Sequence, residues 1–477
     1  MEADVLPALA ALRERLAALG AAAVSWESVE ELLLVPLAAP GAAPEPGARR
    51  WVRQDFKARR RAFMEEAAKL ASEGPLHKIE VRRSRCFKDS VTTFSGKGVN
   101  VWRQPLKVTF IGEAGMDSGG VTREWFSCIC AALSRGSLDL FWAGGPAANQ
   151  LYVNPMSSSP SHLKRFHFVG SFMAKALLES AARAKELGPI SLNLRFCEPF
   201  WKLMLGIPLS LMDLQALDPT EFRSLLQILQ LDIDGLIFEA FAWNFTHTRR
   251  GGGAGAGAKD EPEVPALPSG ASPFSGDSST RVEASIPLKP GGGHVKVTNA
   301  NKREYVLLKA QKMLMGAVEA QMSAVIDAFH SLVPRELVEK YGFTPLELQL
   351  LVCGEQVIDI GALKSACKYE DGYTGKEDQI RWFWAAVESF DDVQRRQLLQ
   401  FWSGSDGMPV EGFTALEPAF HIVSVDRMYD KGDRTARLPA AHTCFRQLDL
   451  PRYVSYEETR EKVLTAITIG QGYLALS

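Results

Sequence analysis

The sequence predicts an α+β protein with more than one folded unit. Amphipathic helical stretches fill most of the 477 residues, and short β-type runs such as HIVSV and CFRQLDL gather near the C-terminal end. A chain of this length that is 46% hydrophobic can bury more than one core. Because the helices precede the cluster of strands, we expect a large helical unit followed by a small α+β unit.

Several segments carry the helical spacing of apolar residues. A turn-rich loop, GEAGMDSGG, separates a predicted strand at 106–111 from the helix that follows it. Ser455, with Glu458 three positions later, predicts a capping box at the start of the last helix. The expected helices are 51–71, 121–136, 162–188, 219–232, 303–333, 343–354, 380–402 and 455–470.

Other segments differ from these in composition. Residues 1–50 pair a short helical run with the Pro/Ala/Gly-rich stretch PLAAPGAAPEPGARR, which predicts an extension and a linker. Residues 249–293 are rich in Gly, Pro, Ser and Ala and cannot bury enough apolar surface to offset the cost of ordering. By composition alone this segment would be an interdomain linker. The polar stretch 368–379, with Gly372 and Gly375, predicts a hinge.

The charge balance excludes some classes of partner. A formal net charge of -2, from 54 Lys and Arg against 56 Asp and Glu, leaves no broad basic footprint for nucleic acid. No run of about 18 apolar residues occurs, so no membrane span is expected. Acidic residues and arginines interrupt the first apolar positions, so 1–20 is not expected to be a signal peptide. The expected location is the cytoplasm, with the nucleus as the alternative.

The seven cysteines predict neither a disulfide framework nor a metal site. Their number is odd, and the sequence has no CxxC pair and no Cys/His spacing suited to zinc. Cys128, Cys130 and Cys353 lie in apolar, helix-like runs, where a thiol usually packs as a small hydrophobe. We therefore expect a reducing compartment, no metal and no cofactor.

Cys444 lies in a different setting, LPAAHTCFRQLDLP at 438–451, where prolines bracket a polar and aromatic stretch. A thiolate attacks carbonyl and thioester carbons, so an exposed cysteine with a route to deprotonation is a candidate nucleophile. In a strand, His442 would lie on the same face as Cys444 and could assist proton transfer. The spacing alone nevertheless favours a structural role, because lone cysteines and histidines are more often structural.

Four motifs in order, from about residue 51 to the end, resemble those of HECT-type ubiquitin ligases. LPAAHTCFRQLDLPRY resembles the family's active-cysteine segment. LKVTFIGEAGMDSGGVTREWF resembles the opening of the family's large N-terminal lobe. IRWFWAAVESFDDVQRRQLLQFWSGSDGMPVEGFTAL is similar to its small C-terminal lobe, and ITIGQGYLALS is similar to its short tail.

This resemblance implies a bilobal α+β fold with a large, mainly helical N-lobe and a small α/β C-lobe. The N-lobe would cover 51–367, the flexible hinge 368–379 and the C-lobe 380–477. A subdomain at about 220–305 would dock the ubiquitin-conjugating enzyme. Under this interpretation the low-complexity segment 249–293 is an enlarged loop inside that subdomain, not a domain boundary.

The resemblance also implies the reaction. Ubiquitin would pass from the conjugating enzyme to Cys444 as a glycyl thioester, and then to a lysine of a protein substrate. His442 and Thr443 match the family's residues beside the cysteine and are expected to position or polarise. No full Cys-His-Asp triad is expected. Phe445 is expected to pack.

Further positions match the family. Six of these positions match residues that dock the conjugating enzyme in the family. Alternatively, their side chains fill the subdomain's own core. Tyr473, in the tail, stands where relatives often have phenylalanine. Polar residues in and after the loop GEAGMDSGG, namely Glu113, Asp117, Arg123 and Glu124, are expected to hold the strand-to-helix turn. The docking positions are Ser224, Leu225, Ile228, Phe241, Trp243 and Tyr305.

Two other functions fit the sequence. A thiol hydrolase could use Cys444 and His442 on amide or ester bonds, but it needs an oxyanion hole, which the sequence does not display. A scaffold could keep the fold without catalysing a reaction, although retention of AHTCF argues against this.

Overall fold

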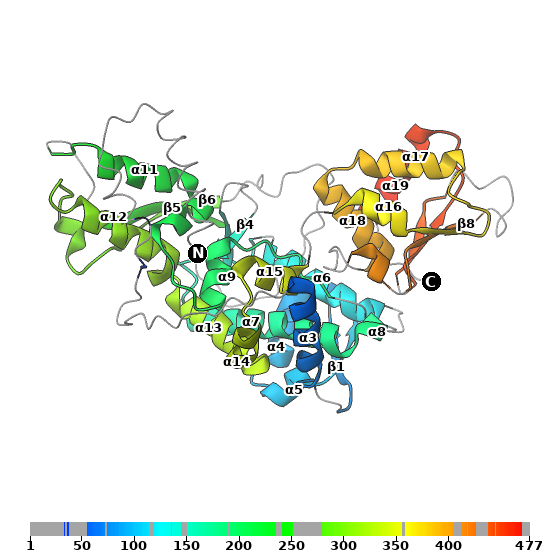
Figure 1. The fold of residues 1–477 in the computed structure, drawn as a ribbon, viewed down its shortest axis with the longest axis horizontal. Coiled ribbons are helices and arrows are strands. Elements are labelled where there is room, and N and C mark those ends of the chain that lie inside the picture. Colours follow the sequence, from blue (N-terminus) through cyan, green and yellow to red (C-terminus); the bar gives the residue numbers. More distant parts are fainter. Residues whose placement is uncertain are drawn as a thin grey trace.

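The computed structural model is elongated, with three groups of elements along its long axis (Figure 1). Helices α11 and α12 with strands β5 and β6 form one end, helices around α7 form the middle, and helices α16 to α19 with a small sheet form the other end. The structure describes residues 33, 36–37, 55–71, 74–113, 119–134, 136–144, 150–187, 190–234, 241–250, 279–354, 358–404, 412–416, 418–425, 437–443 and 445–469.

Helix α7 (Pro160–Ala182) is the axis of the middle group. Ser159 caps its N-terminus by accepting a hydrogen bond from the His162 amide, and Pro160 occupies the first turn. From Phe166 to Ser180 nearly every side chain is buried. Helix α13 (Glu319–Leu332) packs so closely on it that a Cβ at Gly170 would lie 2.1 Å from the Val325 carbonyl oxygen. Only glycine allows this approach of the two backbones.

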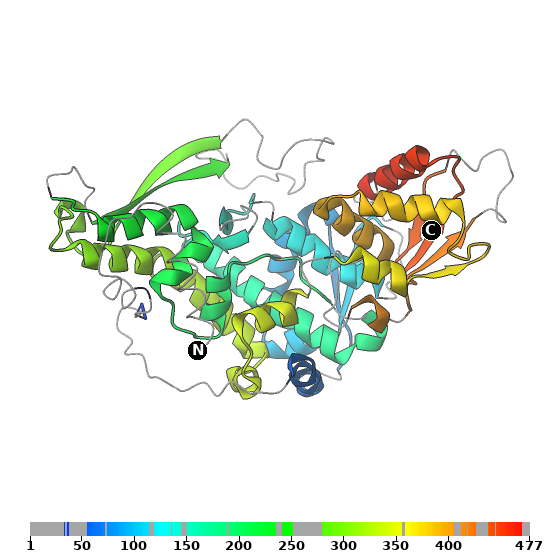
Figure 2. The same cartoon turned by 45° about the horizontal axis from the view of Figure 1, so that its top comes forward.

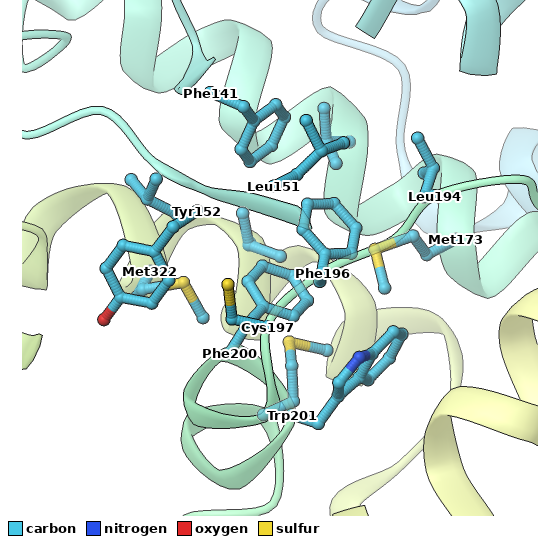
Figure 3. Close-up of a cluster of buried hydrophobic side chains, with 14 of the residues drawn as sticks. Phe141, Leu151, Tyr152, Met173, Leu194, Phe196, Cys197, Phe200, Trp201 and Met322 are labelled. Carbon is cyan, nitrogen blue, oxygen red and sulfur yellow. The ribbon is translucent and has the colours of Figure 1, made fainter. Parts of the chain in front are cut away.

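The other elements of the middle group surround this pair. Strands β1 (His77–Val81) and β2 (Leu106–Phe110) pair in parallel, and β3 (Phe141–Gly144) and β4 (Gln150–Val153) pair antiparallel. Aromatic side chains from β3, β4 and the segment before α9 form a dense apolar cluster (Figure 3). The surrounding helices are α3 (Phe56–Ala68), α4 (Cys86–Phe94), α5 (Val99–Arg103), α6 (Gly120–Ser134), α8 (Ala184–Leu187), α9 (Glu198–Met204), α14 (Arg335–Tyr341) and α15 (Pro345–Cys353).

We call the group that includes α11 and α12 the end group. It contains α10 (Leu214–Leu217), α11 (Pro219–Gln230) and α12 (Lys302–Gln311). Asp218 caps α11 by accepting from the amides of Thr220 and Glu221. Strands β5 (Ala242–Arg250) and β6 (Ser279–Pro287) pair antiparallel, with Arg250 opposite Ser279. Part of the predicted low-complexity loop, 249–293, is therefore a strand, because its residues 279–287 form β6 and pair with β5. Residues 251–278 lie outside the described residues.

The second hydrophobic core belongs to the opposite end. Its sheet has the order β7-β8-β10-β9, in which only β9 runs antiparallel to its neighbour. Helices cover one face of this sheet (Figure 2). The strands are β7 (Lys368–Glu370), β8 (His421–Ser424), β9 (Ala440–His442) and β10 (Gln447–Leu450), and the helices are α16 (Ile360–Ala366), α17 (Asp378–Glu388), α18 (Asp392–Ser403) and α19 (Tyr456–Ile469).

The two cores meet at a different place from the predicted boundary. The first core ends at Cys353 and the second begins at Ile358. The predicted hinge, 368–379, lies inside the second unit, because β7 is a strand of its sheet. Tyr373 is buried in the second core and donates to the Leu450 carbonyl at 2.9 Å. The left-handed Gly372 and Gly375, with φ of 105° and 87°, shape the turn after β7.

Several long predicted helices are interrupted. The run 303–333 is divided into α12 and α13 by a π-helical turn, Lys312–Gly316. The run 380–402 is divided into α17 and α18, where Asp391 and Gln394 form a capping box. Ser455 accepts from the Glu458 amide as expected, but the Glu458 carboxylate accepts from Val454 instead of Ser455. Within the described ranges, no helix combines the length and the apolar character needed to cross a membrane.

Candidate active site

The cysteine loop, which we define as 443–446, joins β9 to β10 at the edge of the small sheet. The hairpin register places Gln447 opposite His442, so the loop connects two directly paired positions. Inside it, the Phe445 amide donates to the His442 carbonyl at 3.0 Å. Cys444 itself lies outside the described residues. Strand β9 ends at His442, so the strand alternation that predicted a shared face for His442 and Cys444 does not continue through Thr443.

Arg446 anchors the loop to the core of the small unit. Its backbone is left-handed, with φ of 51°, a conformation that costs a non-glycine residue about 1 kcal/mol. Its carbonyl accepts from the indole Nε1 of Trp402 at 2.8 Å and from the His421 amide at 3.0 Å. The residue is only 4% exposed, and its guanidinium donates to the Pro418 carbonyl at 2.9 Å. These contacts fix the end of the cysteine loop.

His442 is paired with a carboxylate. Its Nε2 lies 3.0 Å from Oδ2 of Asp449, and Asp449 stands on β10 two positions beyond the residue directly opposite His442. Diagonal neighbours in an antiparallel pair are within side-chain reach. When Nε2 donates its proton to this carboxylate, the neutral ring keeps Nδ1 as a proton acceptor. The pair therefore gives His442 a defined orientation beside the cysteine loop.

The Asp449 carboxylate is itself oriented. Gln447 donates to Asp449 Oδ1 at 2.6 Å, and the Gln447 Oε1 lies 3.3 Å from His421 Nε2. Strand alternation puts Gln447 and Asp449 on one face of β10, whereas Leu448 and Leu450 on the other face are buried in the core. A row of polar side chains thus crosses β8, β10 and β9 and ends at His442.

Sequence reasoning missed Asp449. The alternation in QLDL could have indicated that Asp449 and Gln447 share the polar face of a strand. The pairing with His442 also requires the cross-strand register, which the sequence does not display.

The described cysteines outside the loop are poor candidates for a nucleophile. Cys197 is buried in the aromatic cluster of Figure 3, and burial raises the pKa of its thiol to about 12. Burial likewise raises the pKa of Cys353 and of Cys367. Cys86 and Cys130 are buried, and Cys128 is half-buried. Desolvation disfavours the thiolate form that reacts with a thioester.

Thr443 lies at the junction of the two units. Its carbonyl accepts from Nη2 of Arg123 on α6 at 3.0 Å. Arg123 therefore contacts the other unit as well as the Leu187 carbonyl of its own unit. Glu113 and Glu124 do brace the strand-to-helix turn, because both carboxylates bind the guanidinium of Arg83. Asp117 lies outside the described residues.

The predicted docking positions fall into separate groups. Leu225 and Phe241 are 0% exposed and Tyr305 is 2% exposed, and the Phe241 and Tyr305 rings meet edge to face at 5.4 Å. These three side chains fill the core of the end group, which was the alternative role. Ser224 and Ile228 are half-buried on α11. Trp243 lies in β5 opposite Ile286.

The sequence also singled out Phe445 and Tyr473. Phe445 was expected to pack but is 64% exposed, because the loop directs it away from the core that Arg446 enters. Tyr473 lies outside the described residues. Among the residues that the structure describes, no group of three His, Cys, Asp or Glu side chains could hold a metal ion.

The mainly helical chain with small mixed sheets agrees with the α+β class that the sequence predicted. Residues 127–475 match the family described as HECT-domain (ubiquitin-transferase). The chain belongs to this family, and its α+β fold is the HECT fold.

The chain is similar to several proteins that are named E3 ubiquitin-protein ligases. The chain is 33% identical over 418 residues to E3 ubiquitin-protein ligase HUWE1 of Mus musculus, covering 87% of this chain and 8% of that protein. It is 32% identical over 405 residues to E3 ubiquitin-protein ligase TOM1-like of Neurospora crassa, covering 84% and 9%. It is 33% identical over 397 residues to E3 ubiquitin-protein ligase UPL2 of Arabidopsis thaliana, covering 83% and 10%. The chain thus spans about a tenth of the length of these relatives.

Proposed function

We propose that this chain is a ubiquitin ligase that accepts ubiquitin on Cys444 and passes it to a lysine of a protein substrate. The observation that carries the proposal is the cysteine loop, which Arg446 anchors on one side and the Asp449-paired His442 flanks on the other. Membership of the HECT-domain family supports the reaction type.

In the first step, the Cys444 thiolate attacks the carbonyl carbon of the glycyl thioester on the conjugating enzyme. A new C–S bond forms at Cys444, the old C–S bond breaks, and the conjugating enzyme's sulfur leaves as a thiolate. Exchange between two thioesters is nearly balanced in energy, so the rate depends mainly on how the two sulfurs are positioned. His442 can take the Cys444 proton at its Nδ1, because Asp449 engages Nε2.

In the second step, the neutral amine of a substrate lysine attacks the same carbonyl carbon. A C–N bond forms, the C–S bond to Cys444 breaks, and the sulfur leaves as a thiolate. The nitrogen loses a proton, for which His442 Nδ1 is the acceptor on this chain. Asp449 acts on this step through His442, by fixing the ring and stabilising its charged form.

The end group that contains α11 and α12 docks the conjugating enzyme. Ile228 is partly accessible, and Leu231, directly after α11, is 54% exposed, so both can contact a partner. Ser224 lies one turn earlier on the same helix. Leu225, Phe241 and Tyr305 support this surface from within. Trp243 on β5 is a further docking position, and Tyr473 acts in the tail.

The hinge between the lobes lies at 354–357, between the last residue of one core and the first of the other. Gly354 ends α15 with φ of 67° and ψ of -171°, a backbone region open almost only to glycine. The chain can therefore turn sharply where the large lobe ends. The N-lobe then extends to Gly354, and the C-lobe begins at Ile358.

The chain acts in the cytoplasm, with the nucleus as the alternative. None of its six described cysteines is paired in a disulfide, which suits a reducing compartment. Its partners are the charged conjugating enzyme, ubiquitin and a protein substrate.

One reconstitution separates this function from the alternatives. The chain is incubated with activating enzyme, conjugating enzyme, ATP and ubiquitin, and a ubiquitin adduct that thiol reductants remove is expected. Cys444→Ala should abolish the adduct, whereas Cys197→Ser, at a buried thiol, serves as the control and should retain it. Hydrolysis of a small ester without the conjugating enzyme would indicate a thiol hydrolase. A folded chain that shows neither activity would be a scaffold.

A further inference from the structure

Arg123 is a buried cation shared between the two lobes. It lies on α6 of the large lobe and is only 4% exposed. Its Nη1 donates to the Leu187 carbonyl of its own lobe at 2.8 Å, and its Nη2 donates to the Thr443 carbonyl of the small lobe at 3.0 Å. The planar guanidinium can hold two acceptors at once in a fixed geometry. Its position therefore ties α6 to the cysteine loop.

The Thr443 carbonyl, which accepts from Arg123, is adjacent in the chain to the proposed nucleophile. It belongs to the peptide bond that joins Thr443 to Cys444, so it lies directly before the proposed nucleophile. The same carbonyl accepts from the Arg446 amide at 3.3 Å, which closes the loop from the other side. Arg123 and Arg446 therefore both donate to the Thr443 carbonyl oxygen.

Other polar contacts also join the two lobes. The Ser127 hydroxyl lies 3.5 Å from the Gly404 carbonyl, and Arg195 lies 4.0 Å from Asp392. A Cβ at Gly404 would lie 3.6 Å from the Thr443 Cβ and 3.7 Å from the Gly120 carbonyl, so α18, α6 and the cysteine loop converge there. The Arg123 bond is the shortest of these polar contacts.

Like charges also meet at this junction. Arg446 and Arg123 approach each other from opposite lobes, and burial followed by the charge of Arg123 lowers the pKa of Arg446 to about 10. Repulsion between two buried guanidinium groups opposes docking of the lobes. The hydrogen bond to Thr443 favours it, so the balance allows the lobes to separate as well as to dock.

The docked arrangement does not suit loading. The elements proposed to bind the conjugating enzyme, α11, α12 and β5, lie at the end of the molecule opposite α17 and β8 (Figures 1 and 2). The cysteine loop contacts α6 in the middle group instead. A loop held on α6 is remote from the elements proposed to bind the conjugating enzyme, which suits the step that follows loading.

We infer that Arg123 is a positioning residue for the second transfer: its guanidinium docks the cysteine loop on α6 and orients the Thr443–Cys444 peptide while the substrate amine attacks. This inference rests on the proposed function. In that attack the C–N bond forms, the C–S bond to Cys444 breaks, and Cys444 leaves as a thiolate. Arg123 touches none of the reacting atoms and acts through the peptide that carries the cysteine.

Single-turnover measurements on the full chain separate loading from discharge. The thioester is formed from charged conjugating enzyme, loading is stopped, and free lysine is added as the acceptor. Arg123→Ala should slow discharge by about 10- to 100-fold, because small misplacements of reacting groups have effects of this size. Its loading rate should be unchanged or higher, since the small lobe is released. Arg123→Lys should discharge at a rate between those of the wild type and Arg123→Ala, because a single ammonium cannot hold both carbonyls.

Arg103→Ala is the matched control. Arg103 also donates to a backbone carbonyl, that of Leu332 at 3.1 Å, but both residues belong to the large lobe. This variant should load and discharge like the wild type. Equal losses of loading and discharge in Arg123→Ala would show that Arg123 only stabilises the large lobe, and normal discharge would overturn the inference. Absence of any adduct in the wild type would instead contradict the proposed function.

Discussion

The two lobes place their charged side chains differently. The large lobe buries complete ion pairs inside its own frame: Lys175 and Glu179 on α7 are 2% and 1% exposed, with Nζ and Oε1 2.7 Å apart. In the small lobe, one group of hydrogen-bonded polar side chains lies beside the cysteine loop, where Asp449 orients His442 and Arg446 anchors the turn. The difference separates charges that maintain the fold from charges that arrange a reactive loop.

The largest effect on stability should come from Glu179→Gln. Glu179 pairs with Lys175 and Arg183 and also accepts from the Leu106 amide at 2.8 Å. Burial lowers the pKa of Lys175, and removing its carboxylate partner leaves an uncompensated charge. Breaking such a pair costs about 3–5 kcal/mol. Calorimetry should show the unfolding transition of the large lobe at a lower temperature and that of the small lobe unchanged.

Glu304→Gln is the control for this variant. Glu304 pairs with Lys289, but its side chain is 50% exposed. Loss of an exposed pair should cost less than about 1 kcal/mol. If Glu179→Gln cost no more than Glu304→Gln, the buried ion pairs would not be what stabilises the large lobe.

Substitution at the proposed hinge should alter catalysis while leaving the two cores folded. Glu355→Pro with Gln356→Pro fixes the backbone between Gly354 and Ile358, and both transfer steps should slow by about tenfold, or about 1.4 kcal/mol in the barrier. Gly372→Ala should instead lower the melting temperature of the small lobe, because φ there is 105°. If Gly372→Ala slowed both transfer steps and the double proline variant only lowered the melting temperature, the hinge would lie at 368–379 instead.

Asp449→Asn tests whether the polar groups of the small lobe serve the rate more than the fold. The amide can keep a hydrogen bond to His442 but cannot stabilise its charged form, so discharge to lysine should slow by about three- to fivefold. The effect should be nearly absent in a His442→Ala background, since Asp449 acts through that ring. Equal effects of Asp449→Asn with and without His442 would mean that Asp449 acts by another route.

The smallest effect should follow deletion of 251–278. Arg250 and Ser279 are directly opposite, so an Asn-Gly turn can close the hairpin of β5 and β6. A shorter connection loses less entropy on folding, and the melting temperature of the large lobe should stay the same or rise slightly. A marked fall would show that side chains of the deleted segment pack on the large lobe.

The sequence predicted the fold class and the family, because each depends on local patterns or on a family-wide motif. It could not distinguish a hinge from a tight turn at 368–379, since Gly372 and Gly375 fit both, whereas the pairing of β7 with β8 favours the turn. It did not indicate that Arg123 also reaches the Thr443 carbonyl, which lies 320 positions away. Such long-range pairings leave no local signal in a single sequence.

The central claim is that Cys444 carries ubiquitin between the conjugating enzyme and the substrate. Cys444→Ser tests it most directly, because a serine hydroxyl that captures ubiquitin forms an ester that resists thiol reductants and yields to hydroxide. We expect a slow adduct of this kind, with peptide mapping by mass spectrometry locating the ubiquitin remnant on residue 444. A reducible adduct on the Cys444→Ser chain, mapped to any other cysteine, would contradict the account.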